Sequence, residues 1–282
     1  MELIETVENM RAWSVKKQVE GRRIGFVPTM GYLHAGHLSL MEYARKECDL
    51  VVVSVFVNPL QFGPKEDLAE YPRDLERDMD LMRPVPVDAV FHPEPKDMYP
   101  PGFQTRVEVT EVTKGWCGAF RPGHFVGVTT VVLKLFNIVR PHVAVFGNKD
   151  FQQVAVIKRM AEDLGLDLIV EGRPTVREPD GLAMSSRNTY LSPKERRKAL
   201  SLSQALKTAQ DMAAGGERDA GKILAAVRGR IEAESGVKIQ YAVLADPVTL
   251  RDVERLEGRA VLALAVFAGG IRLIDNAIIA ES

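Results

Sequence analysis

Two histidines, three residues apart, follow a short apolar run near the start of the chain. They lie in the stretch PTMGYLHAGHLSL, residues 28–40, as His34 and His37. If a helix begins just after His34, both imidazoles lie at its amino end, where free N–H groups and the helix dipole favour anions. Gly31 and Gly36 have no Cβ, so phosphates could approach the backbone closely there. The imidazoles could therefore donate hydrogen bonds to the phosphates of a nucleotide, or they could only cap the first helical turn.

Metal binding is a third interpretation of the same two histidines. They would need a further protein ligand, and the sequence offers no HExxH motif to supply it. The two cysteines of the chain, Cys48 and Cys117, form no CxxC pair. We therefore predict no metal ligand among the side chains of this site.

A lysine follows another apolar run, VAVFG, in the segment Gly147-Asn148-Lys149-Asp150. If the run is a strand, the Lys149 ammonium would lie at the same end of the sheet as the histidines, where it could stabilise charge on a transferring phosphoryl group. It could instead be a solvated lysine at the start of a helix. Asp150 could likewise be the N-cap of the helix that follows.

Amide and hydroxyl side chains supply the remaining candidates. Gln61 and Gln153 are neutral groups suited to a polar, uncharged part of a small substrate, although either could be a surface glutamine. The loop MSSRN, residues 184–188, brings two hydroxyls and an arginine together and could close over a triphosphate. Alternatively, Ser186 or Asn188 caps the segment that follows.

These candidates need elements that bring them to one place, and the first part of the chain alternates between strand and helix patterns. Its apolar, β-branched runs predict strands that are buried on both faces. The predicted strands are 21–29, 50–57, 87–93, 141–147 and 167–176, and the predicted helices between them are 37–49, 73–82, 126–139 and 150–165. This alternation predicts an α/β fold with a doubly wound parallel sheet, in which ligands bind beyond the carboxyl ends of the strands.

The pattern changes after residue 180. Helices are predicted over 194–214 and 220–235, and three strands over 238–246 and 258–279, with the last two joined as a hairpin at Gly269-Gly270. This is an α+β pattern. We predict a first domain over residues 1–182 and a smaller C-terminal α+β domain over residues 183–282.

Composition and charge narrow the class of protein. Lys plus Arg number 37 and Asp plus Glu number 38, and this net charge of −1 argues against a general nucleic-acid binder. No apolar run approaches the roughly 20 residues that span a bilayer. The acidic start MELIETVENMR does not have the pattern of a signal peptide. We expect a cytoplasmic protein with neither a nucleic-acid nor a membrane partner.

Five motifs, taken in order along the chain, resemble those of one enzyme family. They are PTMGYLHAGH, FVNPLQF, HFVGVTTVVLKLFNIVRP, FGNKDFQQ and PTVREPDGLAMSSRNTYLS. Together they resemble the pantothenate synthetase (pantoate–β-alanine ligase) family. The resemblance runs from about residue 22 to about residue 192, and the last 90 or so residues are similar to the family only in size and α+β pattern.

The resemblance implies that residues 1–182 form a Rossmann-like catalytic domain of the HxGH superfamily that binds ATP and pantoate. It also implies that residues 183–282 form a smaller C-terminal domain that covers the active site, and that the protein is a homodimer. It implies that pantoate attacks the α-phosphorus of ATP to give pantoyl adenylate and pyrophosphate, after which β-alanine displaces AMP and forms pantothenate. ATP is then a substrate, and Mg²⁺ bound mainly through the ATP phosphates is expected. An adenylyltransferase of the same superfamily and an inactive nucleotide- or RNA-binding module are the rival functions.

The resemblance also assigns residues. It implies that His37 donates a proton, that Lys149 contacts the phosphates, and that Gln61 and Gln153 hold pantoate. Asn148 stands where the family commonly has Glu, which puts the role of that position alone in question. The implied catalytic residues are His34, His37 and Lys149. The implied ATP-binding residues are Met30, Gly31, Tyr32, Leu33, His34, Ala35, Gly36, His37, Gly147, Asn148, Lys149, Asp150, Val176, Met184, Ser185, Ser186 and Arg187.

Overall fold

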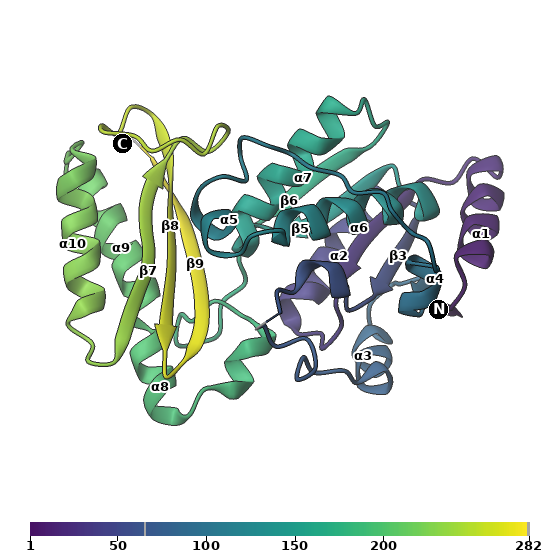
Figure 1. Cartoon of the computed structure of the whole chain (residues 1–282), viewed down its shortest axis with the longest axis horizontal. Helices are drawn as coiled ribbons and strands as arrows, with labels where there is room; N and C mark the ends of the chain where they lie inside the picture. The colour runs from purple at the N-terminus through teal and green to yellow at the C-terminus, as the bar shows by residue number, and fades with distance from the viewer. Residues whose placement is uncertain (65, 281–282) are drawn as a thin grey trace. The chain divides into compact units, whose positions relative to one another are not determined.

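A parallel sheet forms the centre of the first part of the chain (Figure 1). In the computed structural model, which describes residues 1–64 and 66–280, six strands form this sheet in the order β1-β4-β3-β2-β5-β6. The strands are β1 (Glu2–Ile4), β2 (Ile24–Thr29), β3 (Leu50–Val55), β4 (Ala89–Phe91), β5 (Val143–Gly147) and β6 (Ile169–Arg173). Every neighbouring pair is parallel. From β2 the chain builds towards one edge through β3 and β4, and from β5 towards the other, which confirms the predicted doubly wound α/β fold.

Helices cover both faces of this sheet, and the strand residues alternate between them. Phe26 and Val52 pack in a hydrophobic cluster with residues of the helices α1 (Val7–Val19), α6 (His124–Val139) and α7 (Phe151–Asp163). Their neighbours Val27 and Val53 pack in a second cluster, with residues of α2 (Ala35–Glu47) and α3 (Leu75–Met82). Both faces are therefore buried, as the continuous apolar runs predicted. The helices are α1 (Val7–Val19), α2 (Ala35–Glu47), α3 (Leu75–Met82), α4 (Pro95–Met98), α5 (Trp116–Phe120), α6 (His124–Val139) and α7 (Phe151–Asp163), with the 3₁₀ turns η1 (Pro59–Gln61) and η2 (Asn148–Asp150).

The C-terminal part of the chain has its own antiparallel sheet and its own core. The strands β7 (Val237–Ala245), β8 (Arg259–Ala268) and β9 (Ile271–Ala280) pair in that order, and the predicted hairpin turns at Gly269-Gly270, where φ is 59° and 86°. Helices α9 (Ser201–Ala214) and α10 (Ala220–Glu232) pack on the sheet, with α8 (Pro193–Ala199) and the 3₁₀ turn η3 (Ser186–Tyr190) before them. The predicted α+β character of this part is confirmed.

Helices α1, α4 and α5 were not predicted from the sequence, and two further details of the elements differ from the prediction. The N-terminal strand β1 was not predicted, because three residues that pair with β4 carry no periodic signal. The single helix predicted over 194–214 is wrong, since α8 and α9 are separated at Leu200. Leu200 keeps nearly helical angles, with φ −62° and ψ −18°, so no glycine or proline marks the break. Contacts of Arg196 with the carboxylates of Glu178 and Asp180, at 2.6 and 2.7 Å, hold α8 in place.

The chain folds as two compact units. The first unit contains residues 1–148 and 153–174, and the second contains residues 149–152 and 175–282. The domain boundary predicted at 182/183 stays a prediction, because compactness alone does not show which segment folds on its own.

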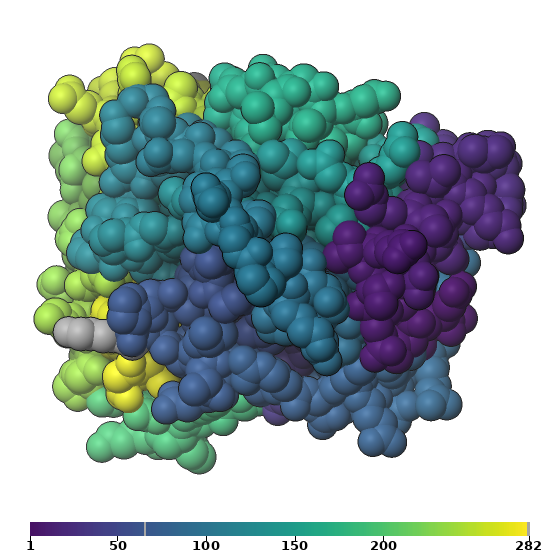
Figure 2. All heavy atoms as spheres, turned by 45° about the vertical axis from the view of Figure 1, so that its right-hand side comes forward, coloured from purple at the N-terminus to yellow at the C-terminus, as the bar shows by residue number. Residues whose placement is uncertain are grey.

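Helix α1 lies at the surface of the first unit, in purple in Figure 2, and its residues Val15 and Val19 are exposed. Within the described part of the chain, no helix is both long enough and apolar enough to cross a membrane.

Candidate active site

Two neighbouring strands of the first sheet carry predicted site residues at their carboxyl ends. β2 ends at Thr29 and leads into the histidine segment, and β5 ends at Gly147 and leads into Asn148. The two strands are adjacent, and the chain continues from them in opposite directions across the sheet. This is the topological switch point, where open α/β sheets bind ligands. The fold therefore brings the histidine segment and Gly147 to the same edge of the sheet.

The histidines cap helix α2, each through one defined ring nitrogen. His34 is the N-cap, and its Nδ1 accepts the N–H of Gly36 at 3.2 Å. His37 reaches back, and its Nδ1 accepts the backbone N–H of His34 at 3.3 Å, which completes a capping box. The ring centroids are 4.1 Å apart. Because Nδ1 accepts in both rings, each neutral imidazole carries its proton on Nε2 and can donate from that atom.

Asp78 on α3 fixes the backbone just before the histidines. Its carboxylate is 1% exposed and accepts the N–H groups of Tyr32 and Leu33, each at 2.7 Å. Tyr32 has a left-handed φ of 51° and Gly31 has one of 82°, so these hydrogen bonds stabilise a strained turn. Burial raises the pKa of Asp78, and the two N–H groups oppose that rise. Asp78 could not be predicted from the sequence, since nothing in its spacing indicates the contact.

Gln61 lies at the end of η1, next to the histidine segment. Its Nε2 is 3.0 Å from Met30 Sδ, and its Oε1 accepts a hydrogen bond from Asn58 Nδ2 at 3.1 Å. Asn58 is 1% exposed and also donates to the Gly127 carbonyl of α6 at 3.1 Å. The fold thus brings together Met30 and Gln61, which were predicted for different substrates. Gln153 is half-buried in the first turn of α7.

An ion pair of limited exposure holds the main chain of Gln61. Arg121 Nε and Nη2 bind the Glu66 carboxylate at 2.7 and 2.6 Å. Arg121 Nη2 and His124 Nδ1 also approach the Gln61 carbonyl oxygen, at 3.4 and 2.9 Å. Burial would raise the pKa of Glu66, but the hydrogen bonds and the charge of Arg121 prevail and lower it to about 2. These residues were not predicted from the sequence, because their only signal is an arginine and a histidine just ahead of an apolar helix.

Lys149 and Asp150 lie in η2, just after β5, but they pack as part of the second unit. Lys149 Nζ is 4.0 Å from Asp150 Oδ2, and the Lys149 carbonyl accepts a hydrogen bond from Asn276 Nδ2 at 2.9 Å. Asn148 belongs to the first unit, and its Oδ1 would be 2.1 Å from a Cβ added to Gly172 of β6. The side chain at position 148, where the family commonly has Glu, therefore packs against a strand.

The predicted nucleotide segments around Val176 and Met184 face each other in a short turn of the second unit. The N–H of Met184 donates to the Val176 carbonyl at 3.0 Å. Ser185 is the N-cap of η3. Helix α8, which follows the loop, has Ser192 as its N-cap, so the alternative that Ser186 or Asn188 caps the following segment is wrong. The structure thus brings Val176 next to Met184 at the start of the MSSR loop, and their nucleotide contacts stay a prediction.

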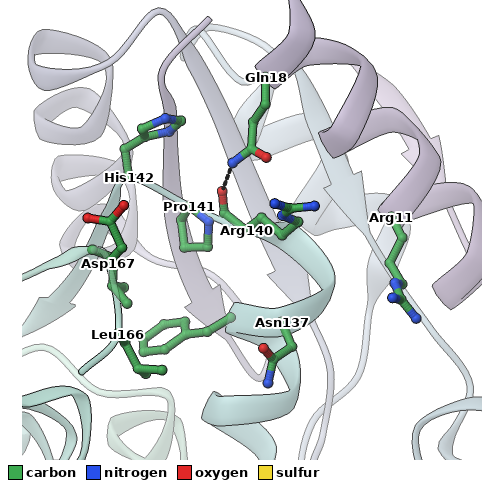
Figure 3. Close-up of a pocket in the computed structure, with 10 residues that line it drawn as sticks. Arg11, Gln18, Asn137, Arg140, Pro141, His142, Leu166 and Asp167 are labelled. Atoms are coloured by element: carbon green, nitrogen blue, oxygen red, sulfur yellow. Dashed lines mark hydrogen bonds between the residues drawn. The ribbon is translucent and has the colours of Figure 1, made fainter. Parts of the chain in front are cut away.

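A cavity of about 590 Å³ lies at the opposite end of the first sheet (Figure 3). Its lining includes His142, just before β5, and Asp167, just before β6, so it lies at the amino ends of these strands. Gln18 and Arg140 also line it, joined by a hydrogen bond from Gln18 Nε2 to the Arg140 carbonyl at 2.8 Å. No predicted site residue contributes to this cavity. Within residues 1–64 and 66–280, no three His, Cys, Asp or Glu side chains gather as a metal site.

Comparison with known proteins identifies the family. The family model described as pantoate-beta-alanine ligase matches residues 2–278. A pantothenate synthetase from Heliobacterium modesticaldum is 57% identical over 279 residues, which cover 99% of each chain. The chain belongs to the pantoate-beta-alanine ligase family. It is therefore an enzyme, a ligase that joins pantoate to β-alanine, and the resemblance predicted from the five motifs is confirmed.

Solved structures agree with this membership of the family. A pantothenate synthetase from Thermus thermophilus is 47% identical, with a TM-score of 0.93 over 98% of this chain and 99% of that chain. A pantoate-beta-alanine ligase from Francisella tularensis, solved in complex with β-γ ATP and β-alanine, is 34% identical, with a TM-score of 0.81 over 99% and 97% of the two chains. The similarity to the family extends through the C-terminal part, so the predicted limit near residue 192 was too short.

Proposed function

We propose that the chain catalyses the two-step reaction of this family with the residues predicted from its sequence. In the first step a carboxylate oxygen of pantoate attacks the α-phosphorus of ATP, and the bond to pyrophosphate breaks to leave pantoyl adenylate. In the second step the amine nitrogen of β-alanine attacks the acyl carbon, loses a proton and displaces AMP. The observation that carries this proposal is the capped histidine segment at the switch point of the sheet, in a chain that matches the family over residues 2–278.

In this proposal the histidines act through Nε2. Both Nδ1 atoms accept backbone N–H groups, so the Nε2–H groups of His34 and His37 are the donors that would contact the ATP phosphates. His37 would donate to the oxygens on which charge develops as pyrophosphate leaves. The left-handed turn at Gly31 and Tyr32, held by Asp78, would let the phosphates approach the backbone of the segment.

Neutral amides would hold pantoate. Gln61 and Gln153 would bind its polar groups without neutralising its carboxylate, which has to stay nucleophilic. Arg121 lies behind the Gln61 carbonyl, but its charge is compensated by the bidentate pair with Glu66. The site would contribute mainly positioning and the exclusion of water from a labile adenylate.

Further residues predicted from the sequence would supply the other nucleotide contacts. Lys149 would bind the phosphates, Asp150 the ribose, and the backbone of Val176 the adenine, while Met184 to Arg187 would close over the triphosphate. Mg²⁺ would be held mainly by phosphate oxygens, as is common for this ion, and would screen the charge of the triphosphate. We also propose a cytoplasmic homodimer, and sedimentation at twice the 31.3 kDa of the chain would support the dimer.

A partial-reaction assay tests the proposed function. The pure protein is mixed with Mg-ATP and pantoate, and pyrophosphate and AMP are followed with and without β-alanine. We expect many turnovers of AMP only when pantoate and β-alanine are both present. Many turnovers of pyrophosphate with no AMP, even when β-alanine is present, would indicate an adenylyltransferase, and no product in either mixture would indicate a binding module.

A further inference from the structure

Two polar residues lie side by side in the buried middle of the last strand. Asp275 is 3% exposed and Asn276 is 9% exposed, within β9, the edge strand of the C-terminal sheet. Buried polar side chains are costly unless they form hydrogen bonds, so the partners of these two residues indicate their purpose. The two are linked to each other, because the N–H of Asn276 donates to Asp275 Oδ1 at 2.8 Å.

Asn276 binds the main chain of a predicted catalytic residue. Its Nδ2 donates to the Lys149 carbonyl at 2.9 Å, across 127 positions of the sequence and within the second unit. Lys149 lies in η2, the single turn between β5 and α7, where a strand passes into a helix. The position of its side chain therefore depends on how this turn is held, and Asn276 supplies a donor for that purpose.

Asp275 binds the other nucleotide segment of the same unit. Its two carboxylate oxygens accept Nη1 and Nη2 of Arg177 at 2.6 and 2.9 Å, a bidentate pair. Arg177 directly follows Val176 and pairs with Ala183 in an antiparallel bridge. Fixing Arg177 therefore also fixes the turn that presents Val176 and the start of the MSSR loop.

We propose that Asp275 and Asn276 are positioning residues, which hold the Lys149 turn and the 176–187 segment in the arrangement that ATP requires. The inference rests on the proposed nucleotide contacts of those segments. It gives a chemical role to β9, in the part of the chain for which the sequence showed no motif. Neither residue touches the reacting atoms, so both act through the backbone or side chain that they hold.

The main test replaces Asn276 with leucine, which has a similar shape and no donor. We expect Asn276→Leu to lower kcat/KM for ATP in adenylation about tenfold, as loss of one hydrogen bond does, and to leave the KM for pantoate unchanged. The matched control is Asn137→Leu, because exposed Asn137 on α6 also donates from Nδ2 to a backbone carbonyl, that of Leu133, at 3.0 Å. We expect native kinetics from this control.

Asp275→Asn is a second, isosteric test that weakens the hold on Arg177. It should raise the KM for ATP without changing that for pantoate, and it keeps the proposal testable if Asn276→Leu folds poorly. A merely structural role predicts a lower melting temperature together with equal losses for both substrates. That result in either variant, or native ATP kinetics in both, would overturn the proposal.

A third variant separates this inference from the proposed role of Lys149. Lys149→Ala should abolish most adenylation, and adding Asn276→Leu to it should then cost little more, because both changes act on the same contact. If Lys149→Ala keeps native activity, the proposed role of Lys149 fails. If Lys149→Ala is inactive while Asn276→Leu behaves like its control, only the positioning role fails.

Discussion

In His34 and His37, Nδ1 accepts a hydrogen bond from a backbone N–H. The proton of each neutral ring is therefore on Nε2, from which it could be donated to a ligand. A histidine at the start of a helix can either cap the helix or contact a ligand, and the two roles are usually treated as alternatives. Here the cap orients each ring and fixes its tautomer, so capping prepares the Nε2–H donor rather than competing with it. The residue types and their spacing were enough to predict the segment, but only the geometry shows that the two interpretations are compatible.

The two roles of His37 can be separated by substitution. A glutamine at the third helical position can still accept the N-cap N–H, as in ordinary capping boxes, whereas alanine cannot. We expect His37→Gln and His37→Ala both to slow adenylation about a hundredfold, since each loses the imidazole donor. Only His37→Ala should also lose about 1 kcal/mol of stability, measured by urea unfolding. Near-native turnover of His37→Gln would show that His37 is a cap and nothing more.

Other residues of the site could not be predicted from the sequence. Asp78 binds the backbone of Leu33 across 45 positions, and Asn276 binds that of Lys149 across 127. Their chemistry depends on burial and on which backbone group the fold brings near, and a single sequence encodes neither locally. The histidine segment and the MSSR loop carry their signal in adjacent residues, which explains why the sequence alone could suggest them as candidates.

Packing between elements positions Gln61 as much as hydrogen bonds do. Helix α6 approaches η1 so closely that a Cβ on Gly127 would lie 2.2 Å from the Leu60 carbonyl oxygen. Only glycine allows this approach, and the same glycine's carbonyl accepts the hydrogen bond from Asn58. The apolar pattern predicted α6 correctly, but it gave no reason to expect a required glycine on its face.

Gly127→Ala should therefore displace η1 and its glutamine. We expect the KM for pantoate to rise roughly tenfold or more, with a smaller change in the KM for ATP, because misplacing a binding group by a fraction of an ångström is costly. The control is Gly229→Ala on α10, where an added Cβ meets nothing within 4 Å. That change should keep native kinetics and stabilise the protein by up to about 1 kcal/mol. Equal kinetics of the two variants would contradict the argument.

The amino ends of the strands contain a group that responds to pH. His142 precedes β5, and its Nδ1 accepts the N–H of Ile24 at 3.0 Å, at the start of β2. Burial and the charge of Arg23 lower the pKa of His142 below its usual value of 6.5. The folded protein thus binds this proton less readily than the unfolded chain. The stability that neutral His142 contributes is complete above pH 6.5 and is lost as the pH falls through its lower, folded pKa.

His142→Asn should remove this part of the pH dependence, because an amide oxygen can accept the same N–H and does not titrate. The measurement is the free energy of unfolding in urea between about pH 7.5 and 5, for both proteins. We expect the slope below the usual histidine pKa of 6.5 to be smaller in the variant. An unchanged slope would show that other groups dominate the loss of stability in acid.

At the scale of the whole molecule, the two units have separate hydrophobic cores. The clusters on the two faces of the parallel sheet draw only on the first unit, and the third cluster, among α8, α9, α10 and the antiparallel sheet, draws only on the second. Alternating strand and helix patterns followed by an α+β pattern were enough to predict this division into two kinds of architecture. A single predicted boundary at 182/183 cannot describe this division, because residues 149–152 pack with the second unit while residues 153–174 belong to the first.

Because the two cores are separate, we expect a core mutation to destabilise only the unit that contains it. The positions of the tryptophans allow the unfolding of the first unit to be measured separately. Both tryptophans, Trp13 and Trp116, belong to the first unit, so their fluorescence reports that unit, whereas far-UV circular dichroism reports both. Ile157 and Ile223 are fully buried in the first and second cores, and alanine at either should cost about 2–5 kcal/mol. We expect Ile223→Ala to lower the circular-dichroism midpoint in urea while leaving the fluorescence midpoint in place, and Ile157→Ala to lower the fluorescence midpoint. If Ile223→Ala shifts both signals equally, the two cores unfold as one cooperative unit.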